Sequence, residues 1–152
     1  MSNPFLNAEV NAPVNYREYF QRYSQTTGAS TVSEYIRKPF PRMVDFWFAA
    51  ICVAVSKELK PIKLDGIKTY KAIEGAAIAS PEWRIHALQL IAIAQTMDVN
   101  IVKDGSRMME IANGLAFAGM PILIEILEGS PGDEALVVYD EFVALTNASS
   151  HP

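Results

Sequence analysis

The chain of 152 residues is poor in the residue types that carry most metal, redox and nucleophile chemistry. Its one cysteine, Cys52, cannot form an internal disulfide, and no CxxC pair is present. The two histidines are His86 and His151, and neither an HExxH nor a Glu-x-x-His motif occurs. These absences exclude the common zinc and di-iron sites, and we expect no metal and no cofactor.

Motifs of nucleotide and acyl-transfer enzymes are also missing. The sequence contains no GxxxxGK[ST] or GxGxxG phosphate loop and no GxSxG nucleophile elbow. Cys52 lies inside an apolar run, where a thiol is expected to be buried and unreactive. We therefore predict no catalytic residue. One enzymatic or small-ligand alternative remains, a helical bundle around His86 and the Met108–Met109 pair, against the simpler interpretation of His86 as a residue at the edge of the core.

Long hydrophobic runs are absent as well. The longest, Phe46–Val55, is far shorter than the roughly 20 residues that a membrane span needs. The N-terminal residues show no basic segment followed by an apolar stretch, as a secretory signal would. These features predict a cytoplasmic protein without a membrane span.

Basic residues are scarce in the second half of the chain. Residues 1–75 hold ten Lys/Arg against seven Asp/Glu, a net +3, whereas residues 76–152 hold three against ten, a net −7. This asymmetry favours oriented docking onto a partner or head-to-tail self-association, although two ordinary solvated faces would show the same pattern. A homo-oligomer therefore stays open.

Most of the local patterns in the sequence predict helices. Half of the residues are hydrophobic and a fifth are charged, as in a single globular domain. The segment at about 42–58 is apolar on all sides, which is typical of a helix surrounded by others. We predict an all-α, single-domain bundle of five to seven helices around this central helix. Residues 13–147 form the helical domain, with a flexible N-terminus at 1–12 and a flexible tail at 148–152.

Several further elements follow from local signals. A short helix is expected over 65–78, and Ser80-Pro81-Glu82 should start a helix that ends near Met97. Asp104 or Ser106 opens the next helix, which should kink or break between Gly119 and Pro121. A last helix follows Asp133. The inward faces of the 80–97 helix and of the last helix are expected to carry Trp83, Ala87, Leu90, Ala94 and Met97, and Leu136, Tyr139, Phe142 and Val143, respectively.

Arginine and tyrosine gather in the N-terminal third. Both residue types are enriched at the energetic centres of protein interfaces. We therefore expect a partner protein to bind at Arg17, Tyr19, Arg22, Tyr35, Arg37, Lys38 and Arg42.

A nucleic-acid contact is the alternative for this basic region. Between Arg37 and Lys71 eight basic residues face three acidic ones, a net +5. The whole chain has a net charge of −4, where nucleic-acid-binding domains are usually basic, so any such contact is weak or indirect. The residues available for it are Lys57, Lys60, Lys63, Lys68 and Lys71.

A resemblance adds context to these patterns. Pro41–Asp45 leads into an aromatic, alanine-rich helix, and Ile111–Leu115, Ile122-Leu123 and Pro131–Asp133 follow in that order. This arrangement resembles small helical accessory proteins encoded beside bacterial DNA-phosphorothioation and related phage-defence genes. The resemblance implies a non-catalytic interaction subunit of a larger assembly, with another protein of that assembly as its partner.

Overall fold

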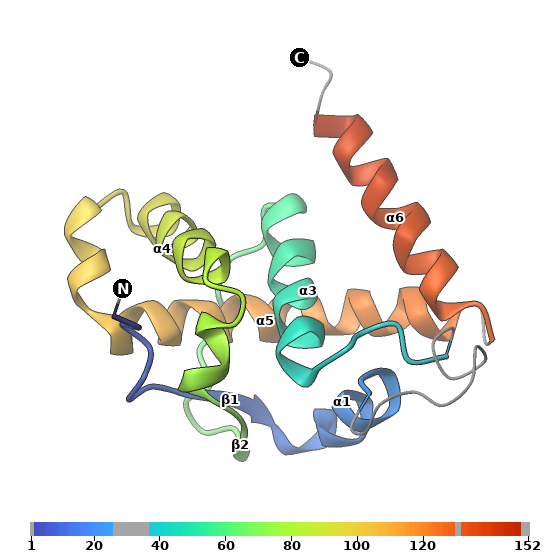
Figure 1. The fold of residues 1–152 in the computed structure, drawn as a ribbon, viewed down its shortest axis with the longest axis horizontal. Coiled ribbons are helices and arrows are strands. Elements are labelled where there is room, and N and C mark those ends of the chain that lie inside the picture. The colour runs from blue at the N-terminus through green and yellow to red at the C-terminus, as the bar shows by residue number, and fades with distance from the viewer. Residues whose placement is uncertain (1, 26–36, 130–131, 150–152) are drawn as a thin grey trace.

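A computed structural model of the chain describes residues 2–25, 37–129 and 132–149. Within them most residues are helical, so the expected helical character is confirmed (Figure 1). The strict all-α prediction is wrong, because β1 and β2 form a two-stranded antiparallel sheet. The elements are β1 (Glu9–Pro13), α1 (Arg17–Tyr23), α3 (Met43–Ser56), β2 (Thr69–Glu74), α4 (Trp83–Thr96), α5 (Gly105–Glu128) and α6 (Glu134–Ser149), with short 3-10 helices at Val14–Tyr16, Gly75–Ala79 and Val99–Lys103.

The core is built where α3 crosses α5. The helix expected near 42–58 is α3, and Phe46, Trp47 and Ile51 within it are fully buried. Gly119 of α5 makes the close approach possible, because a Cβ added there would lie only 2.0 Å from the carbonyl oxygen of Ala50. The apolar circumference of α3 therefore has neighbours on several sides, as its composition requires.

The break predicted between Gly119 and Pro121 does not occur. Helix α5 continues through Pro121 to Glu128 as one element of 24 residues. Pro121 is exposed, so water can satisfy the carbonyl that loses its helical donor. The residues that follow it, Leu123 and Leu127, are buried in the core. Their burial outweighs the local cost of proline, which is about 3 kcal/mol in a helix interior.

The prediction of a helix over residues 65–78 is wrong. Residues 69–74 instead form β2, which pairs with β1 in an antiparallel register that sets Val10 opposite Ile73. Thr69, Tyr70 and Ile73 are the β-branched and aromatic residues that strands favour. The pairing partner lies some sixty positions earlier in the chain, beyond the reach of any local pattern.

The N-terminal residues belong to the folded body, which corrects the boundary expected at residue 13. Phe5 and Val10 have no exposed surface, and β1 begins at Glu9. Gly75 permits this arrangement, since a Cβ there would meet the Phe5 carbonyl oxygen at 2.0 Å. Two apolar side chains anchored in the core hold this segment in place.

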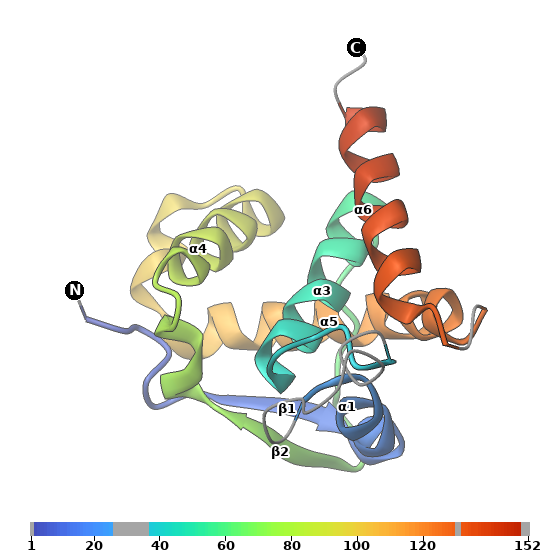
Figure 2. The same cartoon turned by 45° about the vertical axis from the view of Figure 1, so that its right-hand side comes forward.

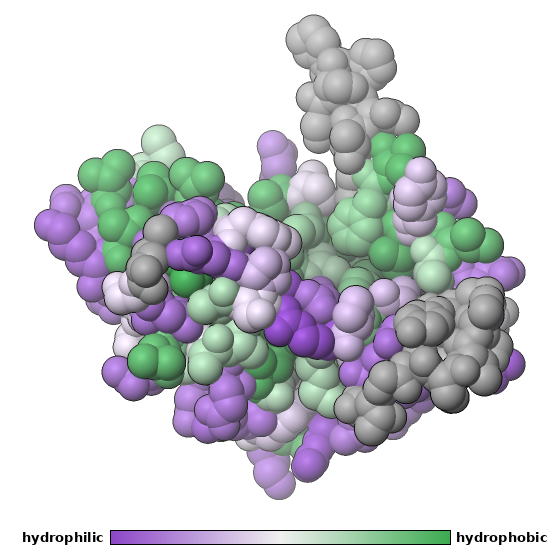
Figure 3. Space-filling view, viewed as in Figure 1, coloured by the Kyte–Doolittle hydropathy of each residue, from purple (hydrophilic) through white to green (hydrophobic). Residues whose placement is uncertain are grey.

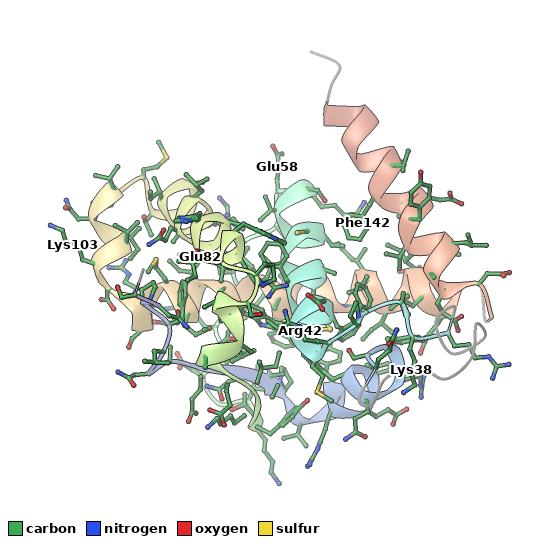
Figure 4. The ribbon with its side chains drawn as sticks, in the orientation of Figure 1. Lys38, Arg42, Glu58, Glu82, Lys103 and Phe142 are labelled. Atoms are coloured by element: carbon green, nitrogen blue, oxygen red, sulfur yellow. The ribbon has the colours of Figure 1, made fainter. Side chains whose placement is uncertain are left out.

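Two helices bury a different set of residues from the one predicted, although Phe142 of α6 packs inward as expected. Trp83, Leu90 and Met97 of the α4 region are exposed, while Ile85, Leu88 and Ala92 are buried. In α6, Leu136, Tyr139 and Val143 are exposed, and Val138 and Phe142 pack against the core. Helix α6 projects from the body in both views (Figures 1 and 2), and Phe142 points from it toward α3 (Figure 4).

Helix α5 also has the length and hydropathy of a membrane-spanning helix, the one such helix within 2–25, 37–129 and 132–149. Its most apolar window is 61% buried inside the protein. The apolar side chains face α3 and the rest of the core, and the core helix of a water-soluble protein has the same composition.

A candidate docking face on α4

The outward side of α4 forms a stripe of four apolar residues and one histidine. We call Trp83, His86, Leu90, Ala94 and Met97 the α4 face; all five are exposed, and they follow one another at spacings of three or four residues. Such spacings place side chains on one side of a helix. Val99, 68% exposed at the start of the next 3-10 helix, extends the stripe. Figure 3 shows hydrophobic residues gathered at this corner of the molecule.

The α4 face contains no acidic or permanently basic side chain. Between Trp83 and Met97 the one such residue is Arg84, which is 2% exposed. A helix face that stays in water normally carries charged residues, whereas the centre of a protein interface is depleted of them. Leu90 is 68% and Met97 88% exposed, so their apolar surface has no cover within this part of the chain.

Trp83 is fixed by contacts on the side that faces α3. Its ring packs against Phe48 of α3 at a centroid distance of 5.4 Å in an edge-on arrangement, and the Arg84 guanidinium carbon lies 5.4 Å from its centroid. The side chain still leaves 54% of its surface exposed. A tryptophan that is fixed on one side and open on the other loses little entropy on binding, which is the property of an interface anchor.

A buried ion pair fixes the start of α4. Arg84 Nη2 lies 2.5 Å from Asp45 Oδ1 at the start of α3, and Arg84 Nη1 donates to the Ser80 carbonyl oxygen at 3.2 Å. Burial lowers the pKa of Arg84, and the opposite charge of Asp45 counteracts this effect. Because a buried cation needs its partner, this pair turns Arg84 inward and thereby turns Trp83 and Leu90 outward.

Met97 ends α4 in a conformation that favours glycine. Its φ is +56°, in the left-handed region, while its N–H donates to the Ile93 carbonyl oxygen at 2.7 Å. A side chain in this region costs about 1–2 kcal/mol. No contact inside the described chain accounts for a methionine here, since 88% of its surface is exposed. Glu58, just after α3, has nearly the same φ, so the conformation is that of an ordinary helix end, and what distinguishes Met97 is its exposed apolar side chain.

The partner-binding residues predicted from the sequence are engaged mainly within the molecule. Arg17 lies over the Tyr70 ring at 5.4 Å, and Arg22 lies over the Tyr19 ring at 5.1 Å and pairs with Glu18 and Glu128. Lys38 Nζ donates to the Gln21 carbonyl oxygen at 2.9 Å.

The remaining residues predicted to bind a partner lie near the end of α1 and near the start of α4. The backbone of Phe40 pairs with Tyr23 and Gln25, which brings the 37–42 segment beside the end of α1. Arg42 donates to the Ser80 carbonyl oxygen, close to the start of α4, and Figure 4 shows Lys38 away from it on the side of α1. Arg37 is exposed, and Tyr35 lies outside the described residues. A role for these residues in partner binding stays a prediction.

The basic residues predicted to contact nucleic acid are on the surface. Lys71 is engaged in ion pairs with Glu74 at 2.8 Å and Glu9 at 3.9 Å. The other four have no ion pair within the part of the chain that the structure describes. The exposed set is Lys57, Lys60, Lys63, Lys68 and Lys71.

The structure does not bring the residues of the enzymatic alternative together. His86 is exposed on α4, whereas Met108 and Met109 are buried in the core. Burial raises the pKa of the Cys52 thiol to about 11, which makes it a poor nucleophile at neutral pH. Over 2–25, 37–129 and 132–149, no group of three His, Cys, Asp or Glu side chains is placed to hold a metal.

Comparison with known proteins yields no relative: no family model, no curated protein and no solved structure matches the chain.

Proposed function

We propose that this protein is a non-catalytic accessory subunit that docks onto another protein through the α4 face. The observation that carries the proposal is the α4 face itself, an exposed apolar stripe without acidic or permanently basic side chains, anchored by a preorganised tryptophan. It replaces the Arg- and Tyr-rich N-terminal region as the principal contact surface, because most of those side chains already have partners within the molecule.

The spacing on α4 favours a helix as the docking element. Trp83, Leu90 and Met97 recur every seven residues, and Ala87 and Ala94 lie between them. This is the heptad pattern of a helix–helix seam, with large residues at one position and small ones at the other that allow close approach. The stripe extends about 21 Å, or four turns. The partner therefore presents an amphipathic helix with an uncharged apolar seam.

The biological setting of the proposal is a bacterial cytoplasmic assembly of antiphage defence or DNA modification. It is supported by the order of segments from Pro41–Asp45 to Pro131–Asp133 that resembles accessory proteins of such systems. The charge asymmetry along the chain adds a means of orienting the subunit as it docks.

The test is capture of the partner from the native host with tagged wild-type protein, followed by calorimetric titration of the purified pair. Leu90→Glu places a charge in the middle of the α4 face and should weaken binding by at least about tenfold, since burying an unpaired charge in an interface is costly. Leu136→Glu is the matched control, because Leu136 is 60% exposed on α6, as Leu90 is 68% exposed on α4.

Equal binding by Leu90→Glu and wild type would overturn the assignment of the α4 face. A loss confined to Leu136→Glu would move the interface to α6. Sedimentation of the isolated protein tells whether the partner is a second copy of this chain or a different protein. Self-association raises the sedimenting mass of the isolated protein, whereas a different partner leaves it unchanged.

A weak nucleic-acid contact is the second candidate, and the exposure of all five predicted lysines favours it. Binding of a DNA duplex should weaken steeply with salt, with a slope that reports the number of phosphates contacted. Replacing Lys57 and Lys68 by glutamine should lower that slope by about two. No binding at low salt, or a slope that the replacements leave unchanged, would remove this candidate.

A further inference from the structure

His86 is the one titratable side chain of the α4 face. Trp83, Leu90, Ala94 and Met97 carry no charge at any pH, and His86 is exposed among them. A histidine side chain changes its charge between about pH 5 and 8. The charge of this otherwise apolar surface therefore depends on a single imidazole.

His86 lies at a central position of the predicted helix seam. When Trp83 and Leu90 are numbered as successive a positions of a heptad, His86, three residues after Trp83, occupies the d position. Side chains at a and d insert into the partner helix and lose their contact with water. A partner helix that covers Trp83 and Leu90 therefore also buries the imidazole between them.

The imidazole brings no partner of its own into such an interface. His86 has no hydrogen bond or ion pair with the rest of the described chain. A protonated imidazole enclosed by an uncharged apolar seam would be an unpaired buried charge, which is far more costly than a buried neutral group. The neutral imidazole needs only hydrogen bonds, and both of its nitrogens can make them. Docking therefore selects the neutral form.

Glu82 is the charged residue nearest to His86 along this side of α4. It precedes His86 by four residues, which is one helical turn, and both side chains are exposed. A neighbouring carboxylate favours the protonated form of an imidazole. Glu82 therefore stabilises the imidazolium in the free protein and adds to the cost of docking at low pH.

The elements packed against α4 contact its opposite side, where Arg84 and Leu88 are buried. The 3-10 helix before α4 contains no titratable residue. Figure 4 shows Lys103, on the 3-10 helix that follows α4, well apart from Glu82. Because His86 faces outward, it does not face the titratable groups of α3 and α5, which are Asp45 and Cys52, and Arg107, Glu110, Glu125 and Glu128, respectively.

We propose that protonation of His86 controls docking at the α4 face, so that the complex forms with the neutral imidazole and weakens as the pH falls. This inference rests on the proposed function. The free protein binds the proton more tightly than the complex does, so acidification favours the free protein. The affinity should fall by about tenfold between about pH 7.5 and 5.5, an interval within the range in which histidine ionises.

The experiment is a calorimetric titration of the captured partner protein into the full chain at about pH 7.5 and 5.5. Two buffers of different ionisation enthalpy report the number of protons released on binding. His86→Gln keeps a polar side chain that does not ionise. His151→Gln is the matched control, because His151 is the other histidine of the sequence. Circular dichroism at both pH values verifies that each variant is folded.

Wild type and His151→Gln should bind about tenfold more weakly at the lower pH and release up to about one proton per complex. The affinity of His86→Gln should change by less than about twofold, because the seam then contains no group that ionises.

Two results would overturn the proposal. One is the same pH dependence in wild type and His86→Gln. The other is tighter binding of wild type at the lower pH, which would identify an acidic side chain of the partner opposite His86. Both leave the proposed function in place as long as Leu90→Glu weakens the complex at the higher pH. A complex that Leu90→Glu leaves unchanged, or no complex at either pH, would overturn the docking function and this inference together.

Discussion

Gly119→Ala tests the packing of α3 against α5 on which the rest of the fold depends. The added Cβ would lie 2.0 Å from the Ala50 carbonyl oxygen and 3.1 Å from the Ala54 nitrogen. Both neighbours are backbone atoms within a helix, so no side chain can rotate away and α3 must shift as a whole. Overpacking of this kind costs about 1–3 kcal/mol, and we expect the upper end.

The substitution also stabilises α5 itself, because alanine is about 1 kcal/mol more favourable than glycine inside a helix. The net loss in free energy of unfolding is therefore about 2 kcal/mol, which lowers Tm by about 4–8 °C in a domain of this size. Urea and thermal unfolding, followed by circular dichroism and by the fluorescence of the buried Trp47, measure both quantities.

Gly129→Ala is the matched control. Its added Cβ would lie 3.3 Å from the Glu125 carbonyl oxygen, and its φ of −69° suits any residue. We expect a change in Tm between zero and a small increase. If Gly119→Ala matched or exceeded the stability of Gly129→Ala, the close crossing of α3 and α5 would be refuted.

Three further predictions follow from single side chains. Arg84→Met removes the nearer of the two cations beside Asp45, which keeps Arg42 Nε at 3.8 Å, and should lower the free energy of unfolding by about 2 kcal/mol in urea titrations; an unchanged midpoint would contradict the buried pair. Met97→Gly should raise the free energy of unfolding by about 0.5–1 kcal/mol by relieving the left-handed φ, while weakening partner binding; an unchanged affinity by calorimetry would remove Met97 from the interface. Burial raises the pKa of Cys52 from 9.0 to about 11, so the unfolded thiol ionises first and stability is lost as pH rises through this interval. Wild type should lose about 2 kcal/mol more than Cys52→Ala between these pH values, and parallel curves would contradict the burial.

The local sequence determined where several helices lie. The run Phe46–Val55 has no polar side to face water, so α3 had to be covered on several sides. The sequence predicted Asp104 or Ser106 as the start of α5, and Asp104 is the cap, since its Oδ1 accepts the Arg107 N–H at 3.0 Å. Such a capping signal joins residues within one helical turn, so both interacting residues can be read from a short stretch of sequence.

The course of the connection between α3 and β2 needed information that no single segment holds. Lys60 and Lys63 were singled out from the sequence, but their position depends on contacts with α5, where the Ile62 N–H donates to the Gly114 carbonyl oxygen at 3.1 Å.

Tertiary contacts decided which side of α4 faces outward. Apolar residues occur around much of that helix, so its periodicity is compatible with either orientation. Arg84 settles the choice, because a cation enters the core only beside a compensating charge, and that charge is Asp45, thirty-nine positions away. The same holds for β2, whose partner strand β1 lies far away along the chain. Local patterns specify an element, whereas its orientation and its pairing are fixed by residues distant in sequence.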